Sequence, residues 1–345
     1  MVANRVEFVS DCTIDRDHQP VISMRSLVKA FEHRGFRLPG RPRGATIAVD
    51  GVDLDIYLGE TLGLVGESGS GKTTLGRMLA GLERPTSGTI YVQGEEWTTT
   101  RHKPLRVRAG TIQMVFQEPH ASLNPRMQVG QSIAEGLVVQ RLFSSQEQRD
   151  RRVTELLRAV GLDPGAANRL PDEFSGGQQQ RIAIARALAV EPDVLVCDEP
   201  VSALDVSVQA QVIELLQRLQ RELGLTVIFI AHDLSVVREL ADRIAVMYFG
   251  QIMEIAPSEA LFERPMNPYT KALISAAPVP NPKVEQSRNR IVLTGELPTK
   301  QEVEGGCVFA TRCWLAEDRC RAEVPSLLGH GFSDRKSRCH FAAEV

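Results

Sequence analysis

The chain lacks long hydrophobic runs. Although 43% of its 345 residues are hydrophobic, no apolar stretch approaches the roughly 18 residues that are needed to cross a bilayer. The N-terminal segment, MVANRVEFVSDC, has no apolar region of the kind that a signal peptide requires. These absences exclude a membrane-spanning segment, and we expect a protein that stays in the cytoplasm.

A strong excess of charge is also missing. The net charge is −3 and the isoelectric point is near 6.2, which gives no overall reason to expect binding to nucleic acid or to an anionic membrane surface. Hydrophobic and charged fractions of 43% and 24% are typical of a globular protein with a sizeable core. A chain of this length predicts two or three domains.

The most informative segment is GESGSGKTT, which spans residues 66–74 between an apolar run and a helix-like segment. This context predicts a phosphate-binding loop rather than a flexible Gly/Ser linker. Glycines at 66, 69 and 71 would let backbone N–H groups surround phosphates. Lys72 would reach the β- and γ-phosphates, and the Thr73 hydroxyl would bind magnesium. The residues expected to hold the nucleotide are Gly66, Glu67, Ser68, Gly69, Ser70, Gly71, Lys72, Thr73 and Thr74.

Hydrophobic periodicity predicts an α/β protein. Residues 21–31 and 47–58 alternate as two strands of a hairpin, and residues 129–189 have a helical period, which indicates a helical insertion in an α/β core. Later segments predict a buried strand at 193–200 and another at 226–231. Six prolines between residues 257 and 282 predict a boundary and loop.

Polar residues follow three of the predicted strands, where open α/β sheets place their ligands. Asp198 follows a buried apolar run and would hold magnesium, while Glu199 would polarise an attacking water. Gln117 follows a strand-like segment at residues 111–116 and would contact magnesium or a water. His232 has the same position on its strand, although a lone histidine is usually structural.

A second anion-binding segment is expected at residues 175–178, where Ser175, Gly176, Gly177 and Gln178 open a predicted helix. Free N–H groups point outward at a helix start and can bind an anion. A Gly-Gly helix cap without function explains the same residues, so the segment alone leaves both interpretations open.

In this order and at this spacing, these motifs resemble the ATP-binding subunits of ABC transporters over about residues 21–260. The resemblance implies a P-loop NTPase core with an antiparallel β subdomain and a helical signature subdomain at about residues 118–189. Residues 1–20 would be a tail, and residues 261–345 a small Cys-rich C-terminal extension. NPYTKALISAAPVPNP at 267–282, TGELP at 294–298 and GCVFATRC at 306–313 are similar to the extension of oligopeptide/dipeptide importer ATPases.

The family resemblance implies roles for individual residues. Residues 66–74 would be Walker A, Asp198 the Walker B aspartate and Glu199 the general base. Gln117 would be the Q-loop glutamine, and His232 the switch histidine. Phe174 to Gln178 resembles the LSGGQ signature, with Phe replacing Leu. Phe31 would stack on the adenine ring, although a core phenylalanine is the simpler interpretation. The implied cofactors are ATP and Mg²⁺, with magnesium held by Thr73, Gln117 and Asp198.

The resemblance also implies partners. A second ATPase subunit, expected to be a paralogue, would pair head to tail with this chain, next to two transmembrane permease subunits and an external binding protein. The protein would be peripheral on the cytoplasmic face of a bacterial inner membrane and would energise import of short peptides. Nickel, opines, sugars or another small solute are alternative cargoes. A soluble ABC ATPase acting on nucleic acid or ribosomes, and a non-hydrolysing regulatory subunit, are more distant alternatives.

Cysteine is scarce except near the C-terminus. Of six cysteines, Cys307, Cys313, Cys320 and Cys339 lie in the last tenth of the chain, with gaps of five, six and eighteen residues. In a reducing compartment such a cluster indicates metal rather than disulfides. These gaps exceed those of typical zinc knuckles, and four thiolates suit either a [4Fe–4S] cluster or Zn²⁺. We expect an iron–sulfur cluster that stabilises the small extension, and we retain zinc and unligated thiols as alternatives.

Overall fold

The computed structural model describes residues 19–32, 45–97, 110–277, 290–293, 295 and 303–345. Most of the expected N-terminal tail and the connection between the first two strands lie outside these residues. So do the end of the 267–282 motif and most of the 294–298 motif.

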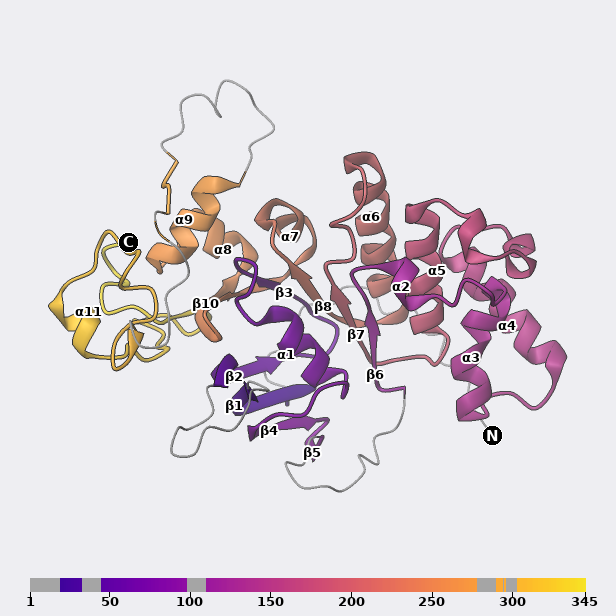
Figure 1. Cartoon of the computed structure of the whole chain (residues 1–345), viewed down its shortest axis with the longest axis horizontal. Coiled ribbons are helices and arrows are strands. Elements are labelled where there is room, and N and C mark those ends of the chain that lie inside the picture. Colours follow the sequence, from indigo (N-terminus) through magenta and orange to yellow (C-terminus); the bar gives the residue numbers. More distant parts are fainter. Residues whose placement is uncertain (1–18, 33–44, 98–109, 278–289, 294, 296–302) are drawn as a thin grey trace, which may run out of the picture.

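A seven-stranded sheet forms the centre of the molecule (Figure 1). Its order is β11-β10-β9-β3-β8-β7-β6, and β9, β3, β8, β7 and β6 run parallel. The carboxyl ends of parallel strands meet at one edge, where ligands bind in open α/β sheets. The strands are β3 (Thr61–Val65), β6 (Ile112–Val115), β7 (Val194–Asp198), β8 (Thr226–Ala231), β9 (Arg243–Tyr248), β10 (Gln251–Pro257) and β11 (Lys336–Ser337).

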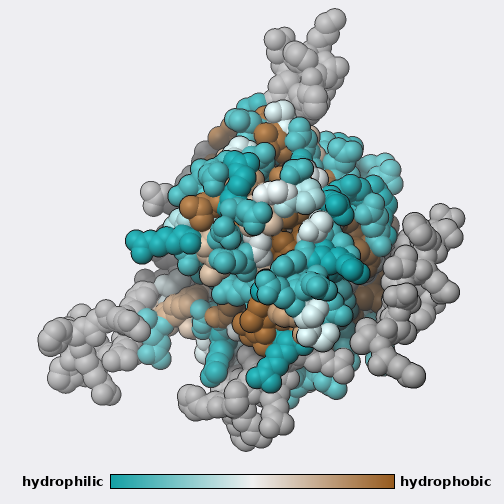
Figure 2. All heavy atoms as spheres, turned by 90° about the vertical axis from the view of Figure 1, so that its right-hand side faces the viewer, coloured by the Kyte–Doolittle hydropathy of each residue, from teal (hydrophilic) through white to brown (hydrophobic). Residues whose placement is uncertain are grey.

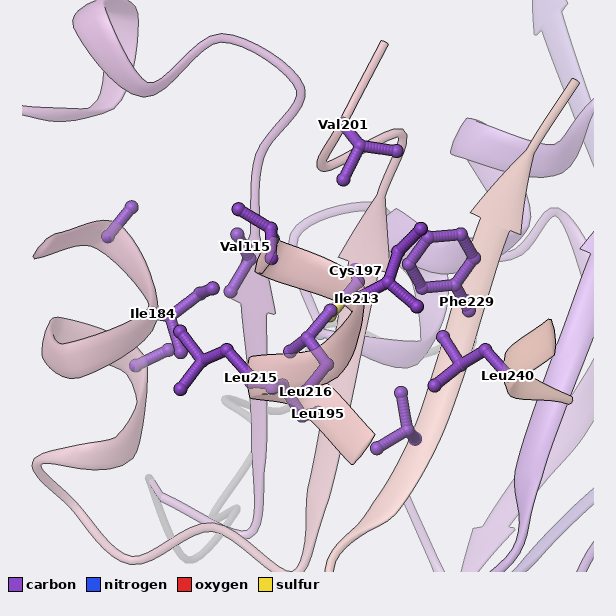
Figure 3. Packing of buried hydrophobic residues seen from close by; sticks show 14 of the residues in the cluster. Val115, Ile184, Leu195, Cys197, Val201, Ile213, Leu215, Leu216, Phe229 and Leu240 are labelled. Carbon is purple, nitrogen blue, oxygen red and sulfur yellow. The ribbon is translucent and has the colours of Figure 1, made fainter. Parts of the chain in front are cut away.

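Both faces of the sheet are buried at its centre, which explains why β3, β7 and β8 are largely apolar runs. Alternate residues of β7 point to opposite sides: Leu195 and Cys197 join one hydrophobic cluster, and Val194 joins the other. Helices α5 (Gly176–Leu188), α6 (Val206–Leu223) and α7 (Leu234–Leu240) contribute to the first cluster, while α1 (Lys72–Leu79) contributes to the second. Figure 3 shows Cys197 among Ile213, Leu216 and Phe229. Cys197 therefore packs in the core as a small apolar side chain.

An antiparallel sheet packs on the α1 side, in the order β2-β1-β4-β5. Its strands are β1 (Ile22–Glu32), β2 (Ala45–Ile56), β4 (Ser87–Val92) and β5 (Glu95–Glu96). β1 pairs antiparallel with β2, which confirms the predicted hairpin.

Helices form one end of the molecule, and the C-terminal residues lie at the other end (Figure 1). They are α2 (Pro119–Ser122), α3 (Val129–Gln140), α4 (Gln146–Ala159) and α5, with 3₁₀ turns at Pro164–Asn168 and Pro171–Glu173. The face predicted for α4 is buried at Val153, Leu156 and Leu157. The surface of this end is mainly hydrophilic, with apolar side chains between polar ones (Figure 2). Across the described residues, no helix combines the length and apolar character needed to span a membrane.

The described part of the proline-rich stretch, residues 257–277, is not the predicted loop. It contains α8 (Ser258–Glu263) and α9 (Pro268–Ala276). Pro268 occupies the first helical turn, where the missing N–H costs nothing, and the Asn267 side chain accepts from the Tyr269 N–H. Here proline starts a helix instead of preventing one.

The C-terminal residues attach directly to the central sheet. β11 pairs with β10 at its edge, and Val308 and Phe309 belong to the main hydrophobic cluster. A short helix, α11 (Asp318–Ala322), lies in the same region (Figure 1). The α/β fold with antiparallel and helical parts is thus the one that the sequence predicts.

Candidate functional site

The phosphate-binding loop connects β3 to α1, and two of its glycines are needed there. Gly66 has φ +153°, and a Cβ at this position would lie 2.0 Å from the Met247 carbonyl oxygen. Gly71, with φ +105°, would place a Cβ 2.0 Å from the carbonyl oxygen of Ala48. Both positions require a left-handed conformation and close backbone approach, which only glycine allows. The loop is therefore held between β9 and β2.

Lys72 is almost fully buried in the loop. Its Nζ donates to the Gly66 carbonyl at 2.8 Å and to the Glu67 carbonyl at 2.9 Å. Burial lowers the pKa of Lys72, against the opposing effect of nearby carboxylates, Glu199 first among them. Because its charge is buried, the ammonium group favours the binding of an anion beside it.

Two of the three residues expected to hold magnesium are in contact. Thr73 Oγ1 donates to Asp198 Oδ1 at 2.9 Å, although the two residues are separated by 125 positions. Burial raises the pKa of Asp198, while the Thr73 hydrogen bond opposes this shift. A hydroxyl and a carboxylate are hard oxygen ligands of the type that Mg²⁺ prefers, so this pair fits the ion.

Glu199 is the centre of a polar group at the strand ends. Its Oε2 accepts from Gln117 Nε2 at 3.2 Å and lies 3.2 Å from His232 Nδ1. Glu199 also has φ +45°, a conformation that costs roughly 1–2 kcal/mol for a residue with a Cβ. The strain fits a functional position, because it aims the carboxylate at Gln117 and His232.

Nine of the predicted residues line one open cavity of about 510 Å³. A cavity of this size and polarity fits a nucleotide. The predicted residues that line it are Ser68, Gly69, Gly71, Lys72, Thr73, Thr74, Gln117, Glu199 and His232, and Ala48 completes the lining.

The segment Ser175–Gln178 lies elsewhere, and among the described residues it does not contribute to that cavity. Ser175 is exposed at the start of α5, where its hydroxyl accepts from the Gln178 N–H and the Gln178 side chain accepts from the Ser175 N–H. Gly177 packs against α6, because a Cβ there would lie 2.3 Å from Val208. This segment forms a helix N-terminus that is open to solvent.

Phe31 is also outside the lining of the cavity as the described residues define it. Its side chain is 40% exposed, and Lys29 Nζ lies 4.8 Å from the ring centroid. Phe31 is therefore a surface residue rather than a core one, and adenine stacking stays a prediction.

Comparison with known proteins agrees with this geometry. Residues 49–202 match a family model described as ABC transporter, and residues 253–320 match one described as oligopeptide/dipeptide transporter, C-terminal region. The putative oligopeptide transport ATP-binding protein YkfD of Bacillus subtilis is 52% identical over 280 residues, which cover 81% of this chain and 85% of the relative. The chain belongs to the ABC transporter ATP-binding family. It is therefore an ATPase with an ABC cassette.

Other relatives support the same membership. Oligopeptide transport ATP-binding protein OppF of Escherichia coli is 50% identical to this ABC ATPase over 82% of the chain and 84% of the relative. A solved dimeric ATP-binding cassette, MJ0796, in a post-hydrolysis state with ADP and Pi, is 31% identical with a TM-score of 0.60. That match covers 69% of this chain and 98% of the cassette.

The four C-terminal cysteines line one small pocket. Burial raises the pKa of Cys313 to about 11 and that of Cys339 to about 12. All five cysteines in the described residues are free thiols. Four thiols are a suitable donor set for zinc or iron–sulfur. However, no three Cys, His, Asp or Glu side chains in the described part of the chain are grouped to hold a metal. The expected iron–sulfur cluster is thus not supported by the thiol geometry.

Two residues that contact the phosphate loop, and a third that contacts one of them, were not predicted. Tyr269 Oη accepts from the Glu67 N–H at 2.8 Å, and Arg312 forms an ion pair with the Glu67 carboxylate. Tyr248 Oη in turn accepts from Arg312 at 3.3 Å. The sequence separations of 202 and 245 residues from Glu67 explain why no local pattern indicated these contacts.

Proposed function

We propose that this chain is the ATP-hydrolysing subunit of a membrane importer for short peptides. The observation that carries the proposal is the combination, in one chain, of an ATP cleft with an intact carboxylate, Glu199, and a C-terminal region of the oligopeptide/dipeptide transporter type at residues 253–320. The printed names of the relatives, which describe peptide and oligopeptide transport, support the same cargo. Nickel, opines and sugars are the alternative solutes.

The cleft of one chain is half of an active site in this proposal. Ser175 and the Gly176 and Gly177 amides would meet the γ-phosphate bound to a second ATPase subunit, and that subunit's signature would complete the cleft of this chain. The exposure of Ser175 and the open side of the cleft support this pairing. We propose that the second ATPase is a paralogue, which makes the pair a heterodimer.

Hydrolysis in the closed pair depends on charge. Lys72 and the loop amides would neutralise the phosphates, and Glu199 would orient and polarise the attacking water. Mg²⁺, held by Thr73, Asp198 and Gln117, would supply positive charge to the phosphate oxygens. His232, which shares Glu199 Oε2 with Gln117, would hold that carboxylate in its productive orientation.

Nucleotide state would pass to the membrane through residues 118–127, which follow Gln117. This segment contains α2. Leu123, which follows α2, packs in the main hydrophobic cluster, and Arg186 donates a hydrogen bond to the Ser122 carbonyl. This segment would face two permease subunits, so that the chain works as a peripheral protein on the cytoplasmic side of the membrane. Loss of the γ-phosphate would then release both the second subunit and the permease surface.

Co-purification of the membrane and binding-protein partners tests this function. ATP turnover of the purified assembly in lipid is measured with di- to pentapeptides, nickel and sugars, each with the cognate binding protein present. We expect peptides to stimulate turnover. Stimulation by nickel or a sugar and not by any peptide would assign the motor to another cargo, and stimulation by RNA without membrane partners would contradict the importer assignment.

For the thiol pocket, we propose an iron–sulfur cluster as a staple of the extension, with zinc as the alternative. The shared pocket of four thiols supports it, although the described side chains include no group of three that could hold a metal. Anaerobically purified protein should contain iron and acid-labile sulfide in stoichiometric amounts. Zinc without sulfide, or no metal at all, would remove the cluster.

A further inference from the structure

An acidic residue inside a phosphate-binding loop needs an explanation. Glu67 lies between Gly66 and Ser68, and Ser68 lines the ATP cavity. An uncompensated carboxylate here would repel the phosphates of ATP. The side chain of Glu67 is only 28% exposed, so solvent screens its charge incompletely.

Arg312 compensates this charge from the C-terminal extension. Its Nη1 donates to Glu67 Oε2 at 2.7 Å and its Nη2 to Oε1 at 3.2 Å. A guanidinium and a carboxylate that share two parallel hydrogen bonds fix each other's orientation as well as their charge. The Arg312 side chain is 8% exposed, so this pair is well shielded from solvent.

The main chain of Glu67 is held from the same side. The Tyr269 hydroxyl accepts from its N–H, and its carbonyl accepts from Lys72 Nζ at 2.9 Å. Glu67 therefore connects Arg312 and Tyr269 to the lysine that is expected to bind the phosphates.

Three aromatic side chains in mutual contact hold Tyr269 and the turn that carries Arg312 in place. The rings of Tyr248, Tyr269 and Phe309 are buried, with centroid separations of 4.6, 5.4 and 5.3 Å. Phe309 and Arg312 belong to one short turn, in which the Arg312 N–H donates to the Phe309 carbonyl at 3.1 Å. The turn thus anchors in the core through Phe309 and presents Arg312 to the loop.

From this arrangement we propose that Arg312 is a positioning residue for ATP: the C-terminal extension holds and neutralises the phosphate loop through the Arg312–Glu67 pair. The extension is then a part of the nucleotide site, and changes in residues 307–313 reach ATP binding through one side chain. The inference rests on the ATPase activity of the chain and is independent of the transported solute.

Arg312→Gln tests the proposal in the full-length protein. ATP affinity should fall about tenfold, the usual size of the loss of a charge-assisted hydrogen-bonded pair, and the loss should grow at low ionic strength as Glu67 is left unpaired. In the assembled transporter the KM for ATP should rise by a similar factor, whereas kcat should stay near the wild-type value. Arg312 holds the loop equally in the ground and transition states, which produces this split.

Two further variants separate positioning from general destabilisation. Glu67→Gln removes the carboxylate that needs compensation, so Arg312→Gln should weaken ATP binding much less in that background than in the wild type. Arg319→Gln is the matched control, because Arg319 forms a similar two-point pair with Glu323 in the same extension but on an exposed helix. Arg319→Gln should leave ATP affinity unchanged.

Wild-type ATP affinity in Arg312→Gln would overturn the proposal, as would an equal loss with and without Glu67→Gln. If Arg312→Gln does not fold, Arg312→Lys takes its place. That variant keeps the charge, loses the two-point geometry, and is expected to lose about threefold in affinity. Unchanged affinity in Arg312→Lys would then overturn the proposal. Neither of these outcomes would affect the proposal of peptide import, since the experiments measure nucleotide affinity.

Discussion

The chain carries two segments for binding phosphate, and they differ in how they are supported. The loop at residues 66–74 has its lysine bonded to its own carbonyls and its backbone held by Met247, Ala48 and Tyr269. The segment Ser175–Gln178 is supported by its own capping box and by packing of Gly177 against α6. The first segment is prepared to bind by itself, whereas the second is exposed at Ser175, Gly176 and Gln178 and, as the described residues define it, does not line the ATP cavity.

Mutations in the two segments should therefore have different effects. Changes at the loop should appear in the nucleotide affinity of the isolated chain. Changes at the signature should appear only after a second ATPase subunit has joined, because that subunit carries the phosphate that Ser175 would meet.

The largest effect should come from Glu199→Gln, which leaves the loop intact and removes the base. Turnover in the assembled transporter should fall about 10³-fold, while the isolated chain keeps its ATP affinity. The variant should also accumulate as an ATP-bound closed pair on size-exclusion chromatography. Glu222→Gln, at an exposed position of α6, is the control. Near-normal hydrolysis by Glu199→Gln would remove this residue as the base.

Gly71→Ala attacks the loop itself. The added Cβ would lie 2.0 Å from the Ala48 carbonyl oxygen at a residue with φ +105°, so we expect a loss of about 3 kcal/mol or more, divided between unfolding free energy and ATP affinity. Denaturant unfolding and nucleotide titration measure the two parts.

Gly224→Ala is the matched control for that variant. Gly224 also has a positive φ, +64°, but a Cβ there meets nothing within 4 Å, so its cost should be about 1 kcal/mol and confined to stability. Equal losses for the two variants would mean that close backbone approach does not matter at Gly71.

The sequence predicted the parts of the site that depend on local pattern and on sheet topology. Gln117, Glu199 and His232 come from different strands, yet they meet because the carboxyl ends of parallel strands share one edge of the sheet. Glycines 66 and 71 follow from the left-handed backbone of the loop, and the close approach of the Met247 and Ala48 carbonyls adds to that requirement. These features require no knowledge of distant side chains.

What the sequence did not predict depends on contacts between remote segments. Arg312 and Tyr269 reach Glu67 across more than 200 residues, and nothing near either residue indicates that partner. The helix α9 was missed for a different reason: the prediction counted prolines and ignored their positions, although Asn267-Pro268 is a helix-start pattern. The cysteine spacing predicted an iron–sulfur cluster, which the structure does not support: the four thiols share a pocket, but the described residues contain no group of three side chains that could hold a metal.

The smallest effect should come from Ser175→Ala, and it tests the comparison most directly. Ser175 is both the N-cap of α5 and the expected ligand of the second subunit's γ-phosphate. Loss of the cap costs about 1 kcal/mol of stability. Ser145→Ala removes an equivalent N-cap, the one that accepts from the Gln148 N–H at the start of α4, and so reproduces that cost. Only Ser175→Ala should also lower the ATP turnover of the assembled transporter, about tenfold, because the Gly176 and Gly177 amides remain. The isolated chain should bind ATP equally well in both variants. If Ser175→Ala weakened ATP binding by the isolated chain, the signature would belong to the same cleft as Lys72, and the division into two half-sites would be wrong.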